Sequence, residues 1–305
     1  MYQQVQIPRL LDKPEFWYRP RQILSRCLYA MRTPPRGSKV SVTLPWGLQI
    51  HCNPTEDVGR AISTQGLYDL VVSKTICRLL DSGELAIDVG ANIGYMSGLM
   101  AWRSGPRGRV LAFEPSSAIR PTLMANLQQW KQDPALAPID LHLSAVSDVT
   151  GTAVLRYPGA FAQNEGVASL ELDHSVGRTE TVTCVTLDSV LDPSQKVGVM
   201  KIDVEGHELA VLKGARELLA AKRVRDIIFE EHRPWPSPVH KLLRESGYAV
   251  FRLSRTLTRL LLVVPDGGSG SDQDPIGVLP NYLATADAKR ARQLLEQRGW
   301  RVLGA

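Results

Sequence analysis

The stretch that decides the fold is Asp88-Val89-Gly90-Ala91-Asn92-Ile93-Gly94, which overlaps the end of the apolar run LAIDV (85–89). Glycines at positions 90 and 94 allow the backbone to turn sharply and a ligand to approach it closely. The residues that follow are expected to open a helix, whose free amide groups would face such a ligand. The stretch therefore predicts a strand, a tight turn and a helix arranged to hold a ligand.

Further apolar runs follow along the chain and alternate with segments of helical pattern. They are VLAFE (110–114), LHLSAV (141–146), VGVMKID (197–203) and DIIFEE (226–231). Continuous apolar runs are typical of parallel strands buried on both faces, and their alternation with helices predicts a doubly wound, mostly parallel sheet. Residues 249–253 and 281–285 are expected to pair and close it. The fold class is therefore Rossmann-like α/β.

The chain is expected to divide into two parts. Residues 1–80 form an N-terminal cap, with a basic amphipathic helix over 20–33 and a hairpin over 39–52. Residues 81–305 form the ligand-binding domain. Within it, residues 254–278 include the low-complexity stretch PDGGSGSDQDP and are expected to be a loop insertion.

The composition excludes several classes of protein. With 44% apolar and 22% charged residues, the 305-residue chain matches an average globular protein. No apolar stretch approaches the roughly 18–20 residues of a membrane span, and no secretory signal opens the chain. The four cysteines are far apart and form no metal-binding pair. We therefore expect a cytoplasmic protein with reduced thiols.

The positive charge is concentrated at the N-terminus. Residues 1–40 hold eight Lys or Arg and only two Asp or Glu, while the whole chain has a formal net charge of +5. Because the excess lies outside the predicted ligand-binding domain, nucleic acid is not expected as a partner. The helix over 20–33 either packs on the main domain or makes a peripheral contact with the inner face of a membrane.

Glu114 ends the run after the glycine turn, where an acid can accept hydrogen bonds from both hydroxyls of a ribose. Turn and acid together would also fit an NAD-dependent oxidoreductase. However, Asn92 stands where the dinucleotide fingerprint has its second glycine, which lets the backbone approach a pyrophosphate. Asp88 suits a cationic ligand that bears an amino acid better than a diphosphate. Both departures favour S-adenosylmethionine as the cofactor.

Polar residues gather where two later runs end. They are Lys201, Asp203, Glu205, His207 and Glu208 after one run, and Glu230, Glu231 and His232 after the next. Ligand sites in open α/β sheets lie at the carboxyl ends of strands. Alternatively, Glu205 and Glu208 only complement a helix dipole and His207 is a surface residue. Two such clusters at one edge favour a chemical role.

The motifs DVGANIG, FEP (113–115), KIDVEGHE (201–208), LKGA (212–215) and FEEH (229–232) resemble those of the FkbM-type methyltransferases. The resemblance covers roughly residues 60–250. It implies a class I methyltransferase fold, with a seven-stranded sheet whose last strand is antiparallel. It also implies S-adenosylmethionine as cofactor and O-methylation of a hydroxyl on a small-molecule, sugar or glycan acceptor.

The resemblance also implies contacts to the cofactor from the acid before the first motif and from residues after the third strand. These are Asp69, where a Glu is commoner in the family, and Ser147 with Asp148. The full set of predicted cofactor-binding residues is Asp69, Asp88, Gly90, Asn92, Gly94, Glu114, Ser147, Asp148 and Asp203.

A hydroxyl needs a proton acceptor to attack a methyl group, and imidazole titrates near neutral pH. His207 and His232 are therefore the candidate bases, oriented by Asp203 and Glu230. No resident metal is favoured, but Asp203, Glu230 and His232 could alternatively hold a divalent cation that lowers the hydroxyl pKa. A catalytically inactive cofactor-binding module is disfavoured because both acidic clusters are intact.

Overall fold

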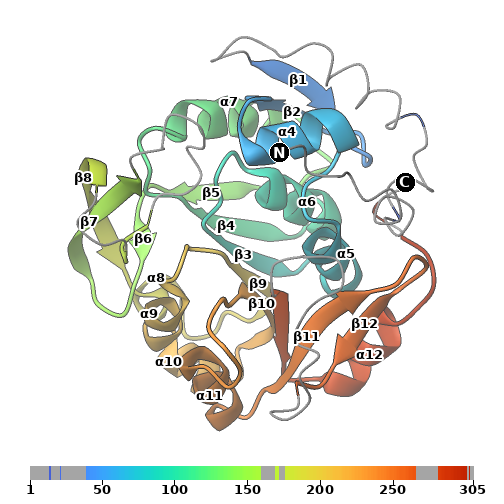
Figure 1. The fold of residues 1–305 in the computed structure, drawn as a ribbon, viewed down its shortest axis with the longest axis vertical. Coiled ribbons are helices and arrows are strands. Elements are labelled where there is room, and N and C mark those ends of the chain that lie inside the picture. Colours follow the sequence, from blue (N-terminus) through green and yellow to red (C-terminus); the bar gives the residue numbers. More distant parts are fainter. Residues whose placement is uncertain are drawn as a thin grey trace, which may run out of the picture.

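A large sheet forms the centre of the protein (Figure 1). The computed structural model describes residues 39–158, 169–171, 176–265 and 281–300, with isolated positions at 14, 21 and 302. From edge to edge the strands are β12 (Leu260–Val263), β11 (Ala249–Arg255), β13 (Asn281–Thr285), β10 (Val224–Glu230), β9 (Val197–Ile202), β3 (Leu85–Val89), β4 (Arg109–Phe113) and β5 (Ile139–His142). Strands β10, β9, β3, β4 and β5 pair in parallel, while β13 runs antiparallel to β10 and β11.

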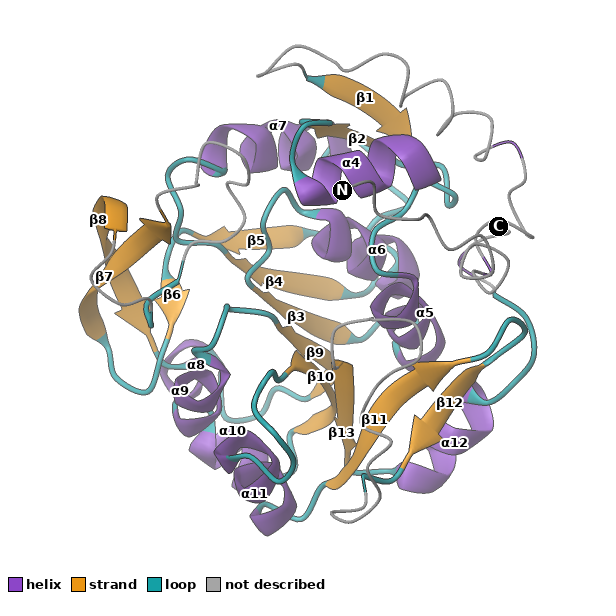
Figure 2. Cartoon of the chain, viewed as in Figure 1, coloured by secondary structure: helices purple, strands orange, loops and turns teal. Residues whose placement is uncertain are grey.

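The sheet is covered on both faces because its central strands are apolar on both faces. All six residues of β9 are buried, and alternate side chains point to opposite sides, so that Val199 joins one core and Met200 the other. Helices contributing to the first core are α4 (Asp57–Gln65), α5 (Leu70–Leu79), α6 (Tyr95–Ser104), α7 (Arg120–Trp130) and α12 (Ala288–Leu295). Helices contributing to the second are α8 (Leu187–Val190), α9 (Glu208–Lys213), α10 (Arg216–Ala220) and α11 (Pro238–Glu245). Figure 2 shows the two groups on either side of the strands.

The predicted doubly wound, mostly parallel fold is confirmed, but the sheet has eight strands instead of seven. The extra strand is β12, which lies inside the segment 254–278 that the sequence analysis expected to be a loop insertion. Leu260 and Leu262 are buried and point to one side, which gives the short strand an apolar face to pack. The predicted closing pair is present, since Ala249–Arg252 pairs with Tyr282–Thr285.

The run LHLSAV does not form one strand. Its first part ends β5 at His142, and its last two residues form β6 (Ala145–Val146), which pairs with β8 (Val176–Val185). Together with β7 (Gly151–Pro158) these strands form a separate three-stranded sheet. The chain leaves the main sheet at its edge, since none of the described strands lies beyond β5, and Leu143 between β5 and β6 is 41% exposed.

The predicted hairpin is also present, as β1 (Val40–Thr43) pairs antiparallel with β2 (Gln49–Cys52). Asn126 on α7 fastens it to the domain: its side chain accepts from the His51 amide (2.7 Å) and donates to the carbonyls of His51 (3.0 Å) and Ile93 (2.9 Å). Of residues 20–33 only position 21 is among the described residues, so the predicted amphipathic helix stays a prediction. In the part of the chain that is described, no helix has the length and apolarity to span a membrane.

Candidate active site

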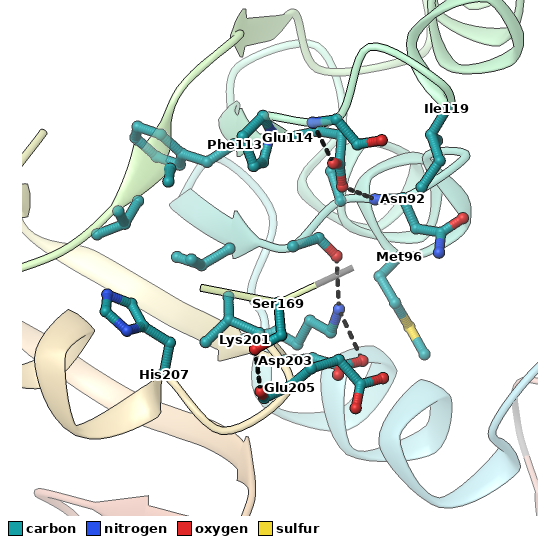
Figure 3. A pocket seen from close by; sticks show the side chains of 18 of the residues that line it. Asn92, Met96, Phe113, Glu114, Ile119, Ser169, Lys201, Asp203, Glu205 and His207 are labelled. Carbon is teal, nitrogen blue, oxygen red and sulfur yellow. Dashed lines mark hydrogen bonds and ion pairs between the residues drawn. The ribbon is translucent and has the colours of Figure 1, made fainter. Parts of the chain in front are cut away.

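A pocket of about 570 Å³ lies at the carboxyl ends of β3, β4, β9 and β10. Its volume falls in the range of roughly 300–1,000 Å³ that is usual for small-molecule sites. Figure 3 shows the side chains that line it. The predicted site residues in its lining are Gly90, Asn92, Glu114, Asp203, His207, Glu230 and His232. The structure thus brings the two distant motifs of the sequence into one cavity.

The glycine turn of the first motif packs directly against the second motif. Gly90 has a φ of +81°, and a Cβ atom there would collide with the backbone oxygen of Asp203. Asn92 also takes a left-handed conformation, with a φ of +52°, and its own side chain accepts a hydrogen bond from the Ile93 amide (2.7 Å). Asparagine tolerates this conformation better than most residues. The turn therefore keeps its shape without the second glycine of a dinucleotide site.

Lys201 joins the strand ends beneath the pocket. Its ammonium group donates to the carbonyl of Gly90 (3.0 Å) and lies 3.5 Å from Asp88 and 3.3 Å from Asp203. The two carboxylates raise the pKa of Lys201 above its ordinary value, although burial acts in the opposite direction. Asp88 is fully buried and also accepts from the hydroxyl of Ser97 (2.6 Å). Asp88 therefore supports the turn from below and does not line the pocket.

Glu114 lies at one end of the pocket, next to the glycine turn (Figure 3). One carboxylate oxygen accepts from the amide of Asn92 and the other from the amide of Ser116, both at 2.9 Å. Each carboxylate oxygen has a second lone pair, so both can still accept a hydrogen bond from a ribose hydroxyl. Burial raises the pKa of Glu114, and the two amides act against that rise. Apolar side chains beside it, Phe113 and Ile119, suit a flat heterocycle.

Acidic side chains gather at the other end of the pocket. Asp203, Glu205 and Glu230 line it together. Burial, reinforced by the negative charges of Asp203 and Glu205, raises the pKa of Glu230 to about 8. His232 lies 3.2 Å from Glu230 and is 52% exposed, so it connects this carboxyl group to solvent. This end of the pocket can therefore accept a proton near neutral pH.

His207 lines the pocket, but both of its ring nitrogens are engaged. Nδ1 lies 2.6 Å from the carboxylate of Glu171, and Nε2 lies 3.0 Å from the hydroxyl of Ser147. A base must have a free lone pair that reaches the proton it accepts. Of the two histidines proposed from sequence, His232 is therefore the one that lies beside an acidic residue of the pocket lining, Glu230.

Several predicted cofactor residues do not line the pocket. Asp69 caps helix α5, where it accepts from the amide of Val72 (3.0 Å) and from the side chain of Asn281 (2.9 Å). Gly94 caps α6 and packs against α7. Ser147 and Asp148 lie past the pocket, because the chain turns away from the main sheet after β5. Their place in the lining is taken by residues 144–146.

The alternative metal site finds no support in the geometry. Within the described ranges, no three His, Cys, Asp or Glu side chains converge in a way that could hold a metal ion. Asp203 is directed to Lys201 instead, which neutralises it locally. Asp203, Glu230 and His232 therefore do not form the cation site that was considered from sequence.

One lining residue, Ser169, was missed by the sequence analysis, and the role of another, Lys201, was not recognised. Ser169 donates a hydrogen bond to the carbonyl of Glu205 (2.6 Å) and so ties residues 169–171 to the second motif. No periodicity marks this segment, so nothing in the sequence pointed to it. The role of Lys201 had a signal, because a lysine within an apolar run is costly to bury unless charges surround it.

Comparison with known proteins identifies the family. The Methyltransferase FkbM domain matches residues 88–250, more than half of the chain. The chain belongs to the FkbM methyltransferase family. This FkbM methyltransferase is therefore an enzyme of the methyltransferase class, and the oxidoreductase alternative is set aside. The family implies S-adenosylmethionine as the cofactor, and the end of the pocket around Glu114 fits its adenosyl group.

Named relatives of this FkbM methyltransferase differ widely in size. AMB antimetabolite synthetase AmbE of Pseudomonas aeruginosa is 31% identical over 64% of this chain, but the match spans only 10% of AmbE. Hexuronic acid methyltransferase AglP of Haloferax volcanii is 28% identical, covering 67% of this chain and 77% of AglP. A crystal structure of an FkbM methyltransferase from Methylobacillus flagellatus has 18% identity and a TM-score of 0.41, covering 67% of this chain and 44% of that one.

Proposed function

We propose that this protein is an S-adenosylmethionine-dependent O-methyltransferase that acts on a hydroxyl of a sugar, glycan or other natural product. The observation that carries the proposal is the division of one pocket into two chemically different ends. Glu114 at one end has free lone pairs for a ribose, and Glu230 at the other can accept a proton. A hydroxyl acceptor requires both functions in one cavity, with the transferred methyl between them.

When bound, the cofactor supplies an electrophilic methyl group. Gly90 and Asn92 would lie along it, and Glu114 would hold its ribose. Lys201 fixes the spacing between the turn at Gly90 and the strand end at Asp203. A fixed spacing between these two strand ends would help to align the acceptor hydroxyl with the methyl group, and such alignment supplies much of the rate of an in-line displacement.

Glu230 is the proposed proton acceptor. Its Oε1 atom is buried and makes no hydrogen bond within the described residues, and Nε2 of His232 lies 3.2 Å away. A carboxyl group whose pKa lies near neutrality is well suited to general base catalysis. His232 would then pass the proton to solvent, since half of its surface is exposed. This assignment exchanges the roles that the sequence analysis gave to histidine and glutamate.

The charge of the acceptor end favours a neutral or cationic acceptor. AglP is named as a hexuronic acid methyltransferase, so its acceptor carries a carboxylate. Here Asp203 and Glu205 line the corresponding space together with Glu230, which is deprotonated in the reactive form of the enzyme, and Lys201 is already shared between Asp88 and Asp203. A further carboxylate would be repelled and left without a partner. We therefore propose a neutral sugar or an amino sugar as the acceptor class.

A matched panel of acceptors tests this proposal. With labelled S-adenosylmethionine, methyl glycosides of glucose, glucosamine and glucuronic acid would be compared at equal concentration. We expect label transfer to the neutral or amino compounds to exceed transfer to the uronic acid by at least about tenfold, which corresponds to 1.4 kcal/mol. Preference for the uronic acid would contradict the charge argument. Cofactor binding without turnover on any of a broad panel of sugars, glycans and natural products would favour an inactive binding module.

The cofactor end is tested by Glu114→Ala. Loss of charged hydrogen bonds to the ribose is expected to weaken binding of S-adenosylhomocysteine by about 1.5–3 kcal/mol, measured by calorimetry. Glu114→Gln keeps the shape but turns an N–H₂ group toward a backbone amide or ribose hydroxyl, so an intermediate loss is expected. Circular dichroism controls for folding, since Glu114 also holds the amides of Asn92 and Ser116. Unchanged affinity in both variants would remove Glu114 from the cofactor site.

A further inference from the structure

A second pocket lies at the amino ends of the parallel strands, on the opposite side of the main sheet from the candidate active site at their carboxyl ends. It has a volume of about 490 Å³ and is lined by the residues that lead into β3, β4, β9 and β10. The amino ends of these parallel strands meet at one edge, just as their carboxyl ends meet at the other. The strands have five to seven residues, so roughly 15–20 Å of sheet separates the two pockets.

The lining of this pocket is strongly basic. Its Lys and Arg residues come from three separate connections of the chain: Arg107 and Arg109, Lys196, and Lys222, Arg223 and Arg225. Glu84 is the one acidic residue among the described residues that line it. Topology alone brings these cations together, since the three connections are far apart in the sequence.

Two of the cations already have acidic partners. Arg225 pairs with Glu84 and Asp226, and Arg109 pairs with Asp140. Glu84 is held in place by packing, because its carboxylate lies against Gly198, where a Cβ atom would collide with it. Glu84 is therefore paired with Arg225 and does not compensate the charges of the other cations in the lining.

Four cations make no ion pair in the described part of the chain, although Arg223 lies near enough to Asp192 to help lower the pKa of its carboxyl group. Arg223 donates to the backbone carbonyl of Asp192 (2.8 Å), and Lys222 donates to that of Ser246. These contacts orient the side chains but carry no negative charge. Arg107 and Lys196 are exposed, and no ion pair or hydrogen bond of their side chains is present among the described residues. The pocket thus concentrates positive charge that a bound anion would compensate.

We propose that this pocket binds a small ligand that carries two linked phosphate groups. Arginine and lysine bind phosphate oxygens with charge-assisted hydrogen bonds, and arginine does so in a bidentate geometry. A single carboxylate would leave most of the four charges uncompensated, whereas a diphosphate carries several negative charges in a compact group. The concave shape and the volume match a small molecule. The diphosphate could be free in solution or attached to a lipid.

Calorimetric titration of the full chain with inorganic pyrophosphate tests the proposal. The variant is Arg107→Ala combined with Lys196→Ala, which removes the two cations that have no other contact. The matched control is Lys131→Ala combined with Lys213→Ala, since both are exposed lysines away from the pocket. We expect binding of pyrophosphate to weaken by about tenfold or more in the variant, because the variant loses two cationic groups that would donate charged hydrogen bonds to the phosphate oxygens. The affinity of the control should stay unchanged. Affinity for S-adenosylhomocysteine should be the same in all three proteins.

A second arm separates the two sources of the ligand. Phosphatidylcholine vesicles with and without farnesyl diphosphate would be sedimented with each protein. Binding of the doped vesicles by the wild type, lost in the variant, supports the site with a lipid-attached diphosphate; pyrophosphate binding alone supports a free ligand. The proposal is overturned if neither probe binds, or if the variant binds both as tightly as the control. These readouts need no methyl transfer, so they are independent of the proposed function.

Discussion

Replacing Glu230 with glutamine is expected to lower the rate of methyl transfer by about 10²–10⁴-fold, the usual contribution of a general base. Glutamine has nearly the same shape but cannot accept the proton at neutral pH. Affinity for S-adenosylhomocysteine should stay within a few-fold, because Glu230 lies at the acceptor end of the pocket. Single-turnover rates with saturating cofactor measure the effect. Glu245→Gln, an exposed residue on α11, controls for the loss of one negative charge.

The pH dependence follows from the same carboxyl group. A base acts in its deprotonated form, and the pKa of Glu230 is raised to about 8. The wild-type rate should therefore climb as pH rises from 6, reach half its maximum near pH 8 and level off about one pH unit higher, while the Glu230→Gln variant should lose this rise. If His207→Ala abolishes activity and Glu230→Gln does not, the base is His207, one of the two histidines that the sequence named as candidates.

Stability gives an independent check on the environment of Glu230. Its pKa is raised from 4.5 in the unfolded reference to about 8 in the folded protein, mainly by burial. Between these values the folded state binds more protons than the unfolded state, so this group lowers stability as pH rises through the interval. Glu230→Gln should therefore raise Tm at pH 8 relative to the wild type, and the difference should shrink toward pH 4.5.

Replacing Lys201 with methionine is expected to lower the free energy of unfolding by about 3–5 kcal/mol. Methionine has a side chain of similar length but carries no charge, so the carboxylate of Asp88 is left buried without its cation. Urea unfolding at pH 7 measures the loss, with Lys213→Met on the surface as the control. The turn at Gly90 also loses a hydrogen bond, so cofactor binding should weaken as well.

A second substitution should repair part of this damage. In the background of Lys201→Met, Asp88→Asn removes the unpaired charge and should recover a large part of the lost stability. The single variant should also gain stability as pH falls, because burial raises the pKa of Asp88 and protonation removes the isolated charge. A loss below about 1 kcal/mol for Lys201→Met would show that the ion pairs contribute little.

The sequence by itself determined the doubly wound α/β class and placed Gly90, Asn92 and Glu114 at one site. The structure of residues 85–94 and the position of Glu114 depend mainly on local sequence. Apolar runs predict buried strands, closely spaced glycines predict a turn, and an acidic residue at the end of a strand is predicted to lie at the ligand site. Parallel pairing then brings the carboxyl ends of strands to one edge. For this reason the DVGANIG and KIDVEGHE motifs could be assigned to one site without any coordinates.

The tertiary structure decided which side chains of the site contact each other. Lys201 stands in a motif recognised from sequence, yet its position between Asp88 and Asp203 follows from the pairing of β3 with β9. Likewise, burial and neighbouring carboxylates raise the pKa of Glu230, while Ser147 and Glu171 occupy both nitrogens of His207. Burial and electrostatic coupling depend on residues far apart in the chain, so no local pattern contains them.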